Sequence, residues 1–355
     1  MITPLASADP AALAPYDDII DVRSPAEFAE DHIPGAINLW VLDNDQRAEV
    51  GTIYVQSSRF LARRIGAAHV ARNIARHLDE RLTDKPGSWS PLVYCWRGGQ
   101  RSNAMATVLE QVGWRVGLVQ GGYKTYRRRV TAALYDAEPD FEVILLDGYT
   151  GTAKTEVLTK LAARGVQTLD LEGLAAHRGS LFGGLPGAPQ PHQKGFESAL
   201  LHALERLDRS RPILVEAESS KVGALNMPPM LWKAMNAASR IELIAPPAAR
   251  ALYLTRAYGD IIADPVALDD TLARLPIHHG KARLDEWREM AGRSDFVGLA
   301  AGLIEHHYDP AYMRSRRGEI RPLMAEIALS DLQPDSLDAA ADRTAAILNE
   351  RAPNR

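Results

Sequence analysis

The sequence contains little cysteine, no long apolar run and no large excess of charge of either sign. Its one cysteine among 355 residues, Cys95, excludes an internal disulfide framework and a zinc site built from several cysteines. No stretch approaches the roughly eighteen uncharged apolar residues of a membrane span. Residues 1–10 lack the basic and apolar segments of a secretory signal. We therefore expect a cytoplasmic protein without a membrane partner, in a reducing compartment where a free thiol persists.

The charges nearly balance. Lysine and arginine number 41, aspartate and glutamate 45, and the formal net charge is −4. This excludes a polycation that coats nucleic acid through bulk charge, although local basic patches can still bind it. The hydrophobic fraction of 46% and the charged fraction of 24% are those of a globular protein, and the length favours two domains, three at most.

Strands that alternate with helices predict an α/β fold with parallel sheets. The composition of residues 137–140 is typical of a linker, so we expect a first domain over 1–135 and a second over 136–355. Beyond about Pro265 the pattern is helical. The predicted strands are 18–22, 91–95, 117–123, 142–147, 166–171, 213–216 and 240–244. The range 117–123 includes the turn that follows the strand.

Cys95 lies in a loop between a predicted strand and a predicted helix. Such a loop turns several backbone N–H groups toward one point, and the helix N-terminus adds partial positive charge. We therefore expect a thiolate nucleophile at neutral pH. The alternative is a small buried hydrophobe at a strand end, but two arginines and two glycines nearby argue against it. The predicted anion nest consists of Arg97, Gly98, Gly99, Arg101 and Ser102.

A second loop, 148–155, follows the strand 142–147 and matches the phosphate-binding pattern G-x-x-x-x-G-K-[ST] except at Ala153. Ala153 adds a methyl group where the backbone approaches phosphate. The loop amides and Lys154 are suited to a diphosphate, and Thr155 to Mg²⁺ if a metal is used. The alternative is an ordinary strand-to-helix turn. The predicted diphosphate-binding residues are Gly148, Thr150, Gly151, Thr152, Lys154 and Thr155.

Acidic residues follow two of the later strands. Glu216 and Glu218, at the end of the strand 213–216, are candidates for metal binding or acid catalysis, and Asp170 is a third. A strand that ends in solvated acids is an equally good interpretation. The histidine pairs 278–279 and 306–307 lack carboxylate neighbours at ligand spacing, so we expect no resident metal there and no tightly bound cofactor.

The runs 21–28 and 32–38, with the cysteine loop, resemble a rhodanese domain, which carries sulfur or selenium on its cysteine. Its fusion to a phosphate loop, with the runs 170–184, 190–197 and 216–223, resembles the tRNA 2-selenouridine synthase family over about residues 17–317. Ala153 departs from the family pattern, as does Lys221, where the family more often has arginine.

The resemblance implies an N-terminal rhodanese-like parallel-sheet domain and a P-loop α/β domain with a helical C-terminal region. It also implies a transferase that acts on tRNA. The family replaces the sulfur of a wobble 5-substituted 2-thiouridine by selenium from selenophosphate, and transfers a geranyl group from geranyl diphosphate onto that sulfur. Cys95 would carry selenium or attack selenophosphate, and the P-loop would hold geranyl diphosphate or a nucleotide. A selenophosphate-producing enzyme is a candidate partner, and the oligomeric state does not follow from the sequence.

An acidic protein needs local basic clusters to bind the anticodon loop of tRNA. Tyr123 and Tyr126 are candidates for stacking on an unpaired base. The alternatives are solvated helix faces for the charges, and a structural or a catalytic role for His177. A further, weaker cluster is Arg314, Arg316 and Arg317. The main candidates are Lys124, Tyr126, Arg127, Arg128, Arg129, His177 and Arg178.

Two other classes of protein stay open. The C-x5-R spacing from Cys95 to Arg101 is that of cysteine phosphatases, although Tyr94 stands where those enzymes usually have histidine. A rhodanese-type sulfurtransferase or such a phosphatase, coupled to an NTPase domain, is therefore one alternative. The other is a non-catalytic tRNA-binding or sulfur-relay module with a vestigial P-loop. This alternative is suggested by Ala153, which stands where the P-loop pattern has glycine.

Overall fold

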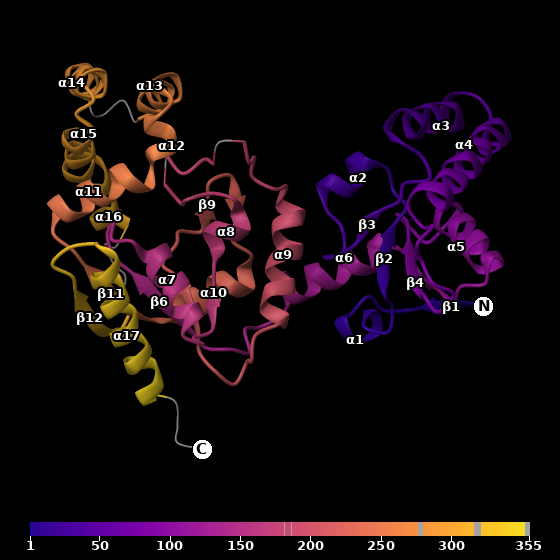
Figure 1. The fold of residues 1–355 in the computed structure, drawn as a ribbon, viewed down its shortest axis with the longest axis horizontal. Coiled ribbons are helices and arrows are strands. Elements are labelled where there is room, and N and C mark those ends of the chain that lie inside the picture. The colour runs from indigo at the N-terminus through magenta and orange to yellow at the C-terminus, as the bar shows by residue number, and fades with distance from the viewer. Residues whose placement is uncertain (181, 186, 276–279, 316–320, 352–355) are drawn as a thin grey trace. The chain divides into compact units, whose positions relative to one another are not determined.

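The computed structural model describes residues 1–180, 182–185, 187–275, 280–315 and 321–351. The chain forms two compact units (Figure 1): Met1–Ala137 with His192–His202, and Glu138–Pro191 with Ala203–Arg355. The predicted boundary at residue 135 lies two residues before the first break. That the chain folds as two separate domains on either side of this boundary stays a prediction. The sequence did not predict that residues 192–202 belong with the first unit.

The first unit is built on a parallel sheet with the strand order β1-β5-β4-β2-β3. The central strand β4 is buried at all four positions, as its apolar sequence predicts, and Cys95 follows it directly. The predicted strands at 18–22, 91–95 and 117–123 correspond to β2, β4 and β5. The strands are β1 (Ile2–Leu5), β2 (Asp18–Asp21), β3 (Ile37–Asn38), β4 (Pro91–Tyr94) and β5 (Val116–Val119).

Helices cover this sheet around a core that includes Val93, Met105 and Leu109. Ser24 begins α2 with a capping box to Glu27, as its position before Pro25 predicts. The helices are α1 (Pro10–Leu13), α2 (Pro25–Glu30), α3 (Asn44–Gln56), α4 (Arg59–Glu80), α5 (Gln100–Val112), α6 (Tyr123–Thr131), the π-helix η1 (Ala132–Asp136) and α9 (Gln193–Glu205), whose last three residues belong to the second unit.

The second unit has its own parallel sheet, in the order β12-β11-β6-β8-β7. Because β6, β8 and β7 are neighbours and parallel, the loops after their carboxyl ends lie along one edge. The helical pattern predicted beyond Pro265 is confirmed by α13 to α17, and one strand that the sequence did not predict, β12, pairs with β11 there. The strands are β6 (Val143–Asp147), β7 (Thr168–Leu169), β8 (Ile213–Glu216), β11 (Ser239–Ile244), β12 (Leu323–Ala328) and the hairpin β9 (Lys221–Val222) with β10 (Leu225–Asn226).

Helices α12 to α15 gather at one side of the second unit (Figure 1), around the fully buried Trp287. Within the described ranges, no helix combines the length and apolar character needed to cross a membrane. The helices are α7 (Lys154–Ala163), α8 (Leu171–Ala175), α10 (Pro229–Ala237), α11 (Pro247–Ala257), α12 (Gly259–Ile262), α13 (Pro265–Ala273), α14 (Lys281–Gly292), α15 (Phe296–Leu303), the π-helix η3 (Ile304–Tyr308), α16 (Asp309–Ser315) and α17 (Pro334–Arg351).

Candidate functional site

The thiol of Cys95 lies at the N-terminus of α5, where two groups donate hydrogen bonds to it. The backbone N–H of Gly99 lies 3.2 Å from Sγ, and the hydroxyl of Ser102 lies 3.1 Å from it. Both donors stabilise negative charge on the sulfur, as does the helix N-terminus. The cysteine is buried, with 3% of its surface exposed. The loop therefore has the anion-stabilising geometry that the sequence predicted.

Two glycines allow this loop to pack against the turn after β5. Gly98 has φ +64°, and a Cβ there would lie 2.9 Å from the backbone nitrogen of Gly121. A Cβ on Gly122 would collide with the carbonyl oxygen of Cys95. A side chain at either position would push the loops apart and move the thiol. The short run after β5 is thus part of the cysteine site.

The two arginines of the cysteine loop differ in their surroundings. Arg101 forms an ion pair with Glu27 of α2, with 2.7 Å between Nη1 and Oε2, and Arg97 is exposed. The predicted contribution of Arg101 to the positive charge of the nest is therefore offset by Glu27. This pairing also gives no support to the C-x5-R phosphatase alternative, which needs that arginine to bind the substrate's phosphate.

In the second unit, the P-loop connects β6 to α7. Ala153 adopts the left-handed conformation, with φ +60° and ψ +33°, and this explains why the pattern has glycine there. A non-glycine residue in this conformation costs about 1 kcal/mol. Ala153 is buried in a core with Val157 and Leu158, yet it also lines the phosphate cavity, so an effect of its methyl group on phosphate binding stays a prediction. The side chain of Lys154 reaches back to the carbonyl of Gly148, 3.0 Å from Nζ.

A residue outside the P-loop, which the sequence did not indicate, stabilises the loop by a hydrogen bond. Arg250 of α11 donates from Nε to the carbonyl of Thr150 over 2.9 Å. Its other two nitrogens lie 2.9 and 2.5 Å from the carboxylate oxygens of Asp309. Arg250 is only 2% exposed, so its guanidinium supports the loop rather than binding a ligand. No motif marks this contact, which brings together residues 100 positions apart.

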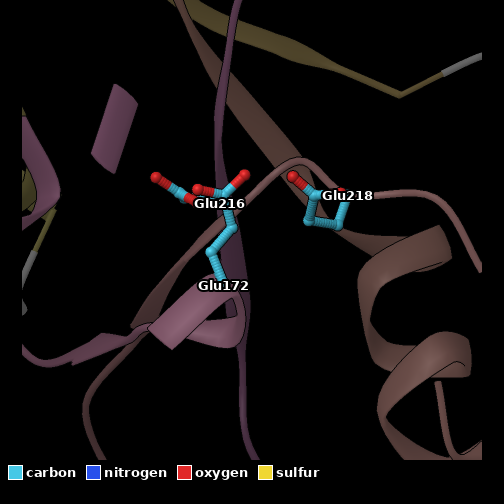
Figure 2. Close-up of side chains that lie close together, drawn as sticks. All are labelled: Glu172, Glu216 and Glu218. Carbon is cyan, nitrogen blue, oxygen red and sulfur yellow. The ribbon is translucent and has the colours of Figure 1, made fainter. Parts of the chain in front are cut away.

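Three carboxylates meet beside the P-loop, as Figure 2 shows: Glu172, Glu216 and Glu218. One oxygen of each lies within 4.8 Å of the others. Glu216 ends β8 and is fully buried, and neither of its oxygens has a hydrogen-bond partner among the described residues. Thr155 donates its hydroxyl to Glu172 over 3.1 Å. Carboxylate and hydroxyl oxygens are the ligands that Mg²⁺ prefers, so these residues fit that ion.

The surroundings of the carboxylates favour their protonated forms. Burial raises the pKa of Glu216, and repulsion from Glu172 raises it further. Burial also raises the pKa of Glu172, with repulsion from Glu218 as a second cause. The same two effects, burial and a neighbouring carboxylate, raise the pKa of Glu218, whereas Lys154 opposes them. A divalent cation would reverse this tendency.

The sequence identified Glu216 and Glu218 but not their third partner. Asp170, the predicted third acid, is exposed and caps α8 by accepting from the backbone N–H of Gly173 over 2.8 Å. Glu172, and not Asp170, completes the group of carboxylates that lie within 4.8 Å of one another, although the negative charge of Asp170 also acts on Glu216. The sequence did contain a signal for Glu172. This residue follows β7, which the sequence predicted as a parallel strand, and β7 pairs with β8, the strand that ends at Glu216.

A cavity of about 700 Å³ opens between the P-loop and these carboxylates. Lys154 and Arg178 both line it, so its wall carries two cations as well as the P-loop backbone. Arg178 donates to Asp260 over 2.9 Å, while its buried Nη1 has no partner in the described part of the chain. The remaining P-loop residues on the cavity wall are Gly148, Thr150, Gly151, Thr152, Ala153 and Thr155.

Two residues predicted to contact tRNA, His177 and Arg178, have other surroundings in the structure. Arg178 belongs to the cavity wall, where its guanidinium adds positive charge near the P-loop. His177 accepts from the backbone N–H of Gly179 through Nδ1 over 3.1 Å, and burial lowers its pKa. Neither residue belongs to an exposed basic cluster, and His177 stabilises a local turn.

The predicted basic helix α6 has two kinds of residue. Lys124 and Arg128 are exposed, and Arg129 is half-buried near Asp9. Tyr126 is buried, with 3% exposed, so the expectation that it stacks on a base is wrong in this structure. Its apolar ring packs into the core, as an amphipathic helix requires. Arg127 forms an ion pair with Glu197.

Tyr123 is also buried, at 2% exposed, and its hydroxyl donates to Asp31 over 2.6 Å. The buried guanidinium of Arg23 lies over its ring, 4.1 Å from the centroid. Tyr123 is therefore a core residue and not a stacking platform. Arg314 is exposed, whereas Arg316, Arg317 and the histidine pair 278–279 lie outside the described residues.

A thiol in an anion nest and a P-loop cavity, carried by two α/β units of one chain, define a rhodanese-like domain joined to a P-loop domain. Residues 8–129 match the rhodanese-like domain, and residues 141–271 match the tRNA 2-selenouridine synthase AAA domain. A tRNA 2-selenouridine synthase of Pseudomonas savastanoi pv. phaseolicola is 31% identical over 92% of this chain and 94% of its own. The chain belongs to the tRNA 2-selenouridine synthase family.

Other relatives match over shorter segments. The tRNA 2-selenouridine synthase of Cupriavidus pinatubonensis is 35% identical over 64% of this chain and 62% of its own. In this comparison the chain spans less than two thirds of the relative's length. Among solved structures, a gluconokinase from Sinorhizobium meliloti shares 16% identity over 61% of this chain and 99% of its own, with a TM-score of 0.23. That likeness is too low to carry an argument.

Proposed function

We propose that this protein replaces the sulfur of a wobble 5-substituted 2-thiouridine in tRNA by selenium from selenophosphate. We further propose that it first transfers a geranyl group from geranyl diphosphate onto that sulfur. Family membership supports the reaction on tRNA. The observation that carries the proposal is the thiol of Cys95, which accepts two hydrogen bonds at a helix N-terminus.

The cysteine loop supports the selenium step. Donors at 3.1 and 3.2 Å from Sγ stabilise a thiolate. The surrounding backbone amides suit the phosphate of selenophosphate. Cys95 therefore acts as the nucleophile on selenophosphate: its thiolate attacks phosphorus, an S–P bond forms, and the P–Se bond breaks to release selenide. Selenide then attacks C2 of the S-geranyl nucleoside and expels geranylthiol, and water hydrolyses the S–P bond to give phosphate and the free thiol.

The P-loop cavity supports the geranyl step. The thiocarbonyl sulfur of the nucleoside attacks C1 of geranyl diphosphate, a C–S bond forms, the C–O bond to diphosphate breaks, and the proton on N3 of the nucleoside passes to the departing diphosphate. Negative charge develops on this leaving group, and Lys154 and Arg178 line the same cavity as the P-loop. The S-geranyl group makes sulfur a better leaving group for the selenium step. Mg²⁺, held by Glu172, Glu216, Glu218 and Thr155, would neutralise further charge on the diphosphate.

Local charge supports tRNA as the macromolecular substrate. Lys124 and Arg128 are exposed on α6, whereas Arg127 and Tyr126 have partners inside the first unit. We propose the exposed pair as the part of α6 that contacts the anticodon stem-loop. A selenophosphate-producing enzyme remains the proposed partner for supply of the donor, and we propose the cytoplasm as the location, where tRNA is present.

Nucleoside mass spectrometry tests this function. The protein is incubated with tRNA that contains 2-thiouridine, with selenophosphate, and with or without geranyl diphosphate. We expect S-geranyl-thiouridine when geranyl diphosphate is present, and 2-selenouridine when both donors are present. If neither product forms with folded protein and a reduced thiol, the proposal is wrong. Turnover of an aryl phosphate that requires Cys95 would instead favour the phosphatase alternative.

A further inference from the structure

An apolar pocket lies beside the P-loop cavity in the second unit. Helices α11 to α13 and α15 form most of its wall, with Phe182 from the segment before α9. Neither the P-loop pattern nor the resemblance to a family identifies this pocket. Its apolar lining includes Phe182, Ile261, Leu268, Phe296, Leu299 and Ala300.

The few polar groups on the pocket wall already have partners. Thr255 donates its hydroxyl to the carbonyl of Leu252 over 2.8 Å. The hydroxyl of Tyr258 lies 2.8 Å from that of Ser180, which also interacts with the hydroxyl of Tyr308. The described wall therefore offers hydrocarbon contact and no unused donor or acceptor. A nucleotide base would leave its own polar edge unpaired there, at a cost in affinity.

The pocket adjoins the phosphate cavity. Leu254, Tyr258 and Tyr308 line both spaces, so these three side chains form the boundary that a ligand reaching from the P-loop into the pocket crosses. The pocket's volume is about 60 Å³. At 10–15 Å³ per water-sized group, this is room for about five non-hydrogen atoms. One isoprene unit has that size, whereas a purine base has about twice as many atoms.

From this geometry we infer that the pocket binds the terminal isoprene unit of an allylic diphosphate whose head group lies in the P-loop. The first isoprene unit then lies in the larger cavity, past Leu254. This inference rests on the proposed function, in which geranyl diphosphate is the donor. It goes further in assigning a chain-length subsite, so that the wall around Ala300 and Phe296 selects two isoprene units over one or three.

Binding of three ligands to the full-length protein tests the subsite without tRNA. Calorimetry compares geranyl diphosphate, dimethylallyl diphosphate and inorganic diphosphate. Because burial of five carbons is favourable, we expect geranyl diphosphate to bind at least about tenfold more tightly than dimethylallyl diphosphate. If geranyl diphosphate binds no more tightly than inorganic diphosphate, the geranyl part of the proposed function fails together with the subsite.

Two alanines in α15 give a matched pair of variants. Ala300 lines the pocket, and its neighbour Ala301 is exposed. Ala300→Leu fills the pocket. We therefore expect it to weaken the binding of geranyl diphosphate about tenfold and to change the affinity for inorganic diphosphate less than about twofold. Ala301→Leu should bind all three ligands as the wild type does. If Ala300→Leu keeps the wild-type preference for geranyl diphosphate, the subsite is wrong and the proposed donor stands.

A variant that enlarges the pocket covers the case in which Ala300→Leu does not fold. Phe296→Ala removes an aromatic ring from the wall, and inorganic diphosphate binding confirms an intact P-loop. We expect the affinity for farnesyl diphosphate relative to geranyl diphosphate to rise about fivefold or more, because the cavity left behind accepts more carbon atoms. An unchanged ratio in this folded variant overturns the inference.

Discussion

Arg127 of α6 forms an ion pair with Glu197 of α9, although the two residues are 70 positions apart in the chain. Glu197 is 1% exposed and also accepts hydrogen bonds from Tyr135 and Gln193, at 2.6 and 2.9 Å. This buried carboxylate needs its cation, because an unpaired buried charge is costly. Arg127 therefore stabilises the first unit and is not available as a phosphate contact.

Arg127→Ala should destabilise the protein. It removes the cation from Glu197, so we expect the free energy of unfolding to fall by about 3 kcal/mol. Chemical denaturation measures this free energy of unfolding, with unfolding monitored through a signal that reports on the first unit. The exposed neighbour Arg128 is the control, and Arg128→Ala should change stability by less than about 0.5 kcal/mol. Equal losses in the two variants would contradict the structural role of Arg127.

Lys154→Ala should weaken diphosphate binding. The ammonium group lines the phosphate cavity, and a charge-assisted hydrogen bond contributes about 1.5–3 kcal/mol, so we expect at least a tenfold rise in the dissociation constant. Titration with inorganic diphosphate measures it. Lys160 lies on the same helix and pairs with Asp338 at 2.9 Å. Lys160→Ala should bind diphosphate normally, and a loss as large as that of Lys154→Ala would point to helix damage.

Arg178 and Arg128 should separate the two kinds of phosphate binding. Arg178→Ala is expected to weaken the binding of inorganic diphosphate about tenfold and to leave tRNA affinity unchanged, because Arg178 lines the phosphate cavity. Arg128→Ala should do the reverse and lower the salt dependence of tRNA binding by about one unit of slope. Filter binding over a range of salt concentrations measures the second effect. If Arg178→Ala weakens tRNA alone, its assignment to the cavity is wrong.

The acidic cluster predicts how stability depends on pH without divalent metal. Glu172, Glu216 and Glu218 have raised pKa values in the folded state, so the folded chain holds protons that the unfolded chain releases. The contribution of this cluster to stability is complete below the ordinary glutamate pKa of 4.5 and is lost as the pH rises toward the folded value of about 8. We expect a loss of several kcal/mol across this window, at about 1.4 kcal/mol for each unit of pKa shift.

Thermal unfolding from pH 5 to pH 8.5, with a chelator present, measures this loss. Glu216→Gln removes one titrating group and should flatten the profile. Added Mg²⁺ should also flatten it, because the ion binds the ionised carboxylates that high pH produces. A wild-type profile without slope in metal-free buffer, or one that Glu216→Gln leaves unchanged, would contradict the buried cluster.

The sequence predicted both loops because each is encoded in one short run of residues. A buried strand, a turn with glycines and a helix start at consecutive positions around Cys95, and the same is true around Lys154. Strand boundaries near 213–216 followed from β-branched and aliphatic residues. β12 was missed because Leu, Met, Ala and Glu favour helices, whereas pairing with β11 decides its conformation.

The partners of these loops could not be read from local patterns. Glu172 reaches Glu216 only because β7 pairs with β8, and Arg250 reaches the P-loop from a helix that follows β11. The basic run in α6 indicated charge, but only tertiary packing separates Arg128, which is exposed, from Arg127, which binds Glu197. Sequence patterns predict which residues a loop contains, and packing decides which of them face a ligand.

The central claim is that one chain carries two separable chemistries, and Cys95→Ala tests it most directly. The variant and the wild type are given the same tRNA, selenophosphate and geranyl diphosphate, and the nucleosides are analysed by mass spectrometry. We predict that the variant accumulates S-geranyl-thiouridine and forms no 2-selenouridine, because the P-loop cavity does not use the thiol. Loss of both products in a folded variant, or 2-selenouridine formed without Cys95, would contradict the account.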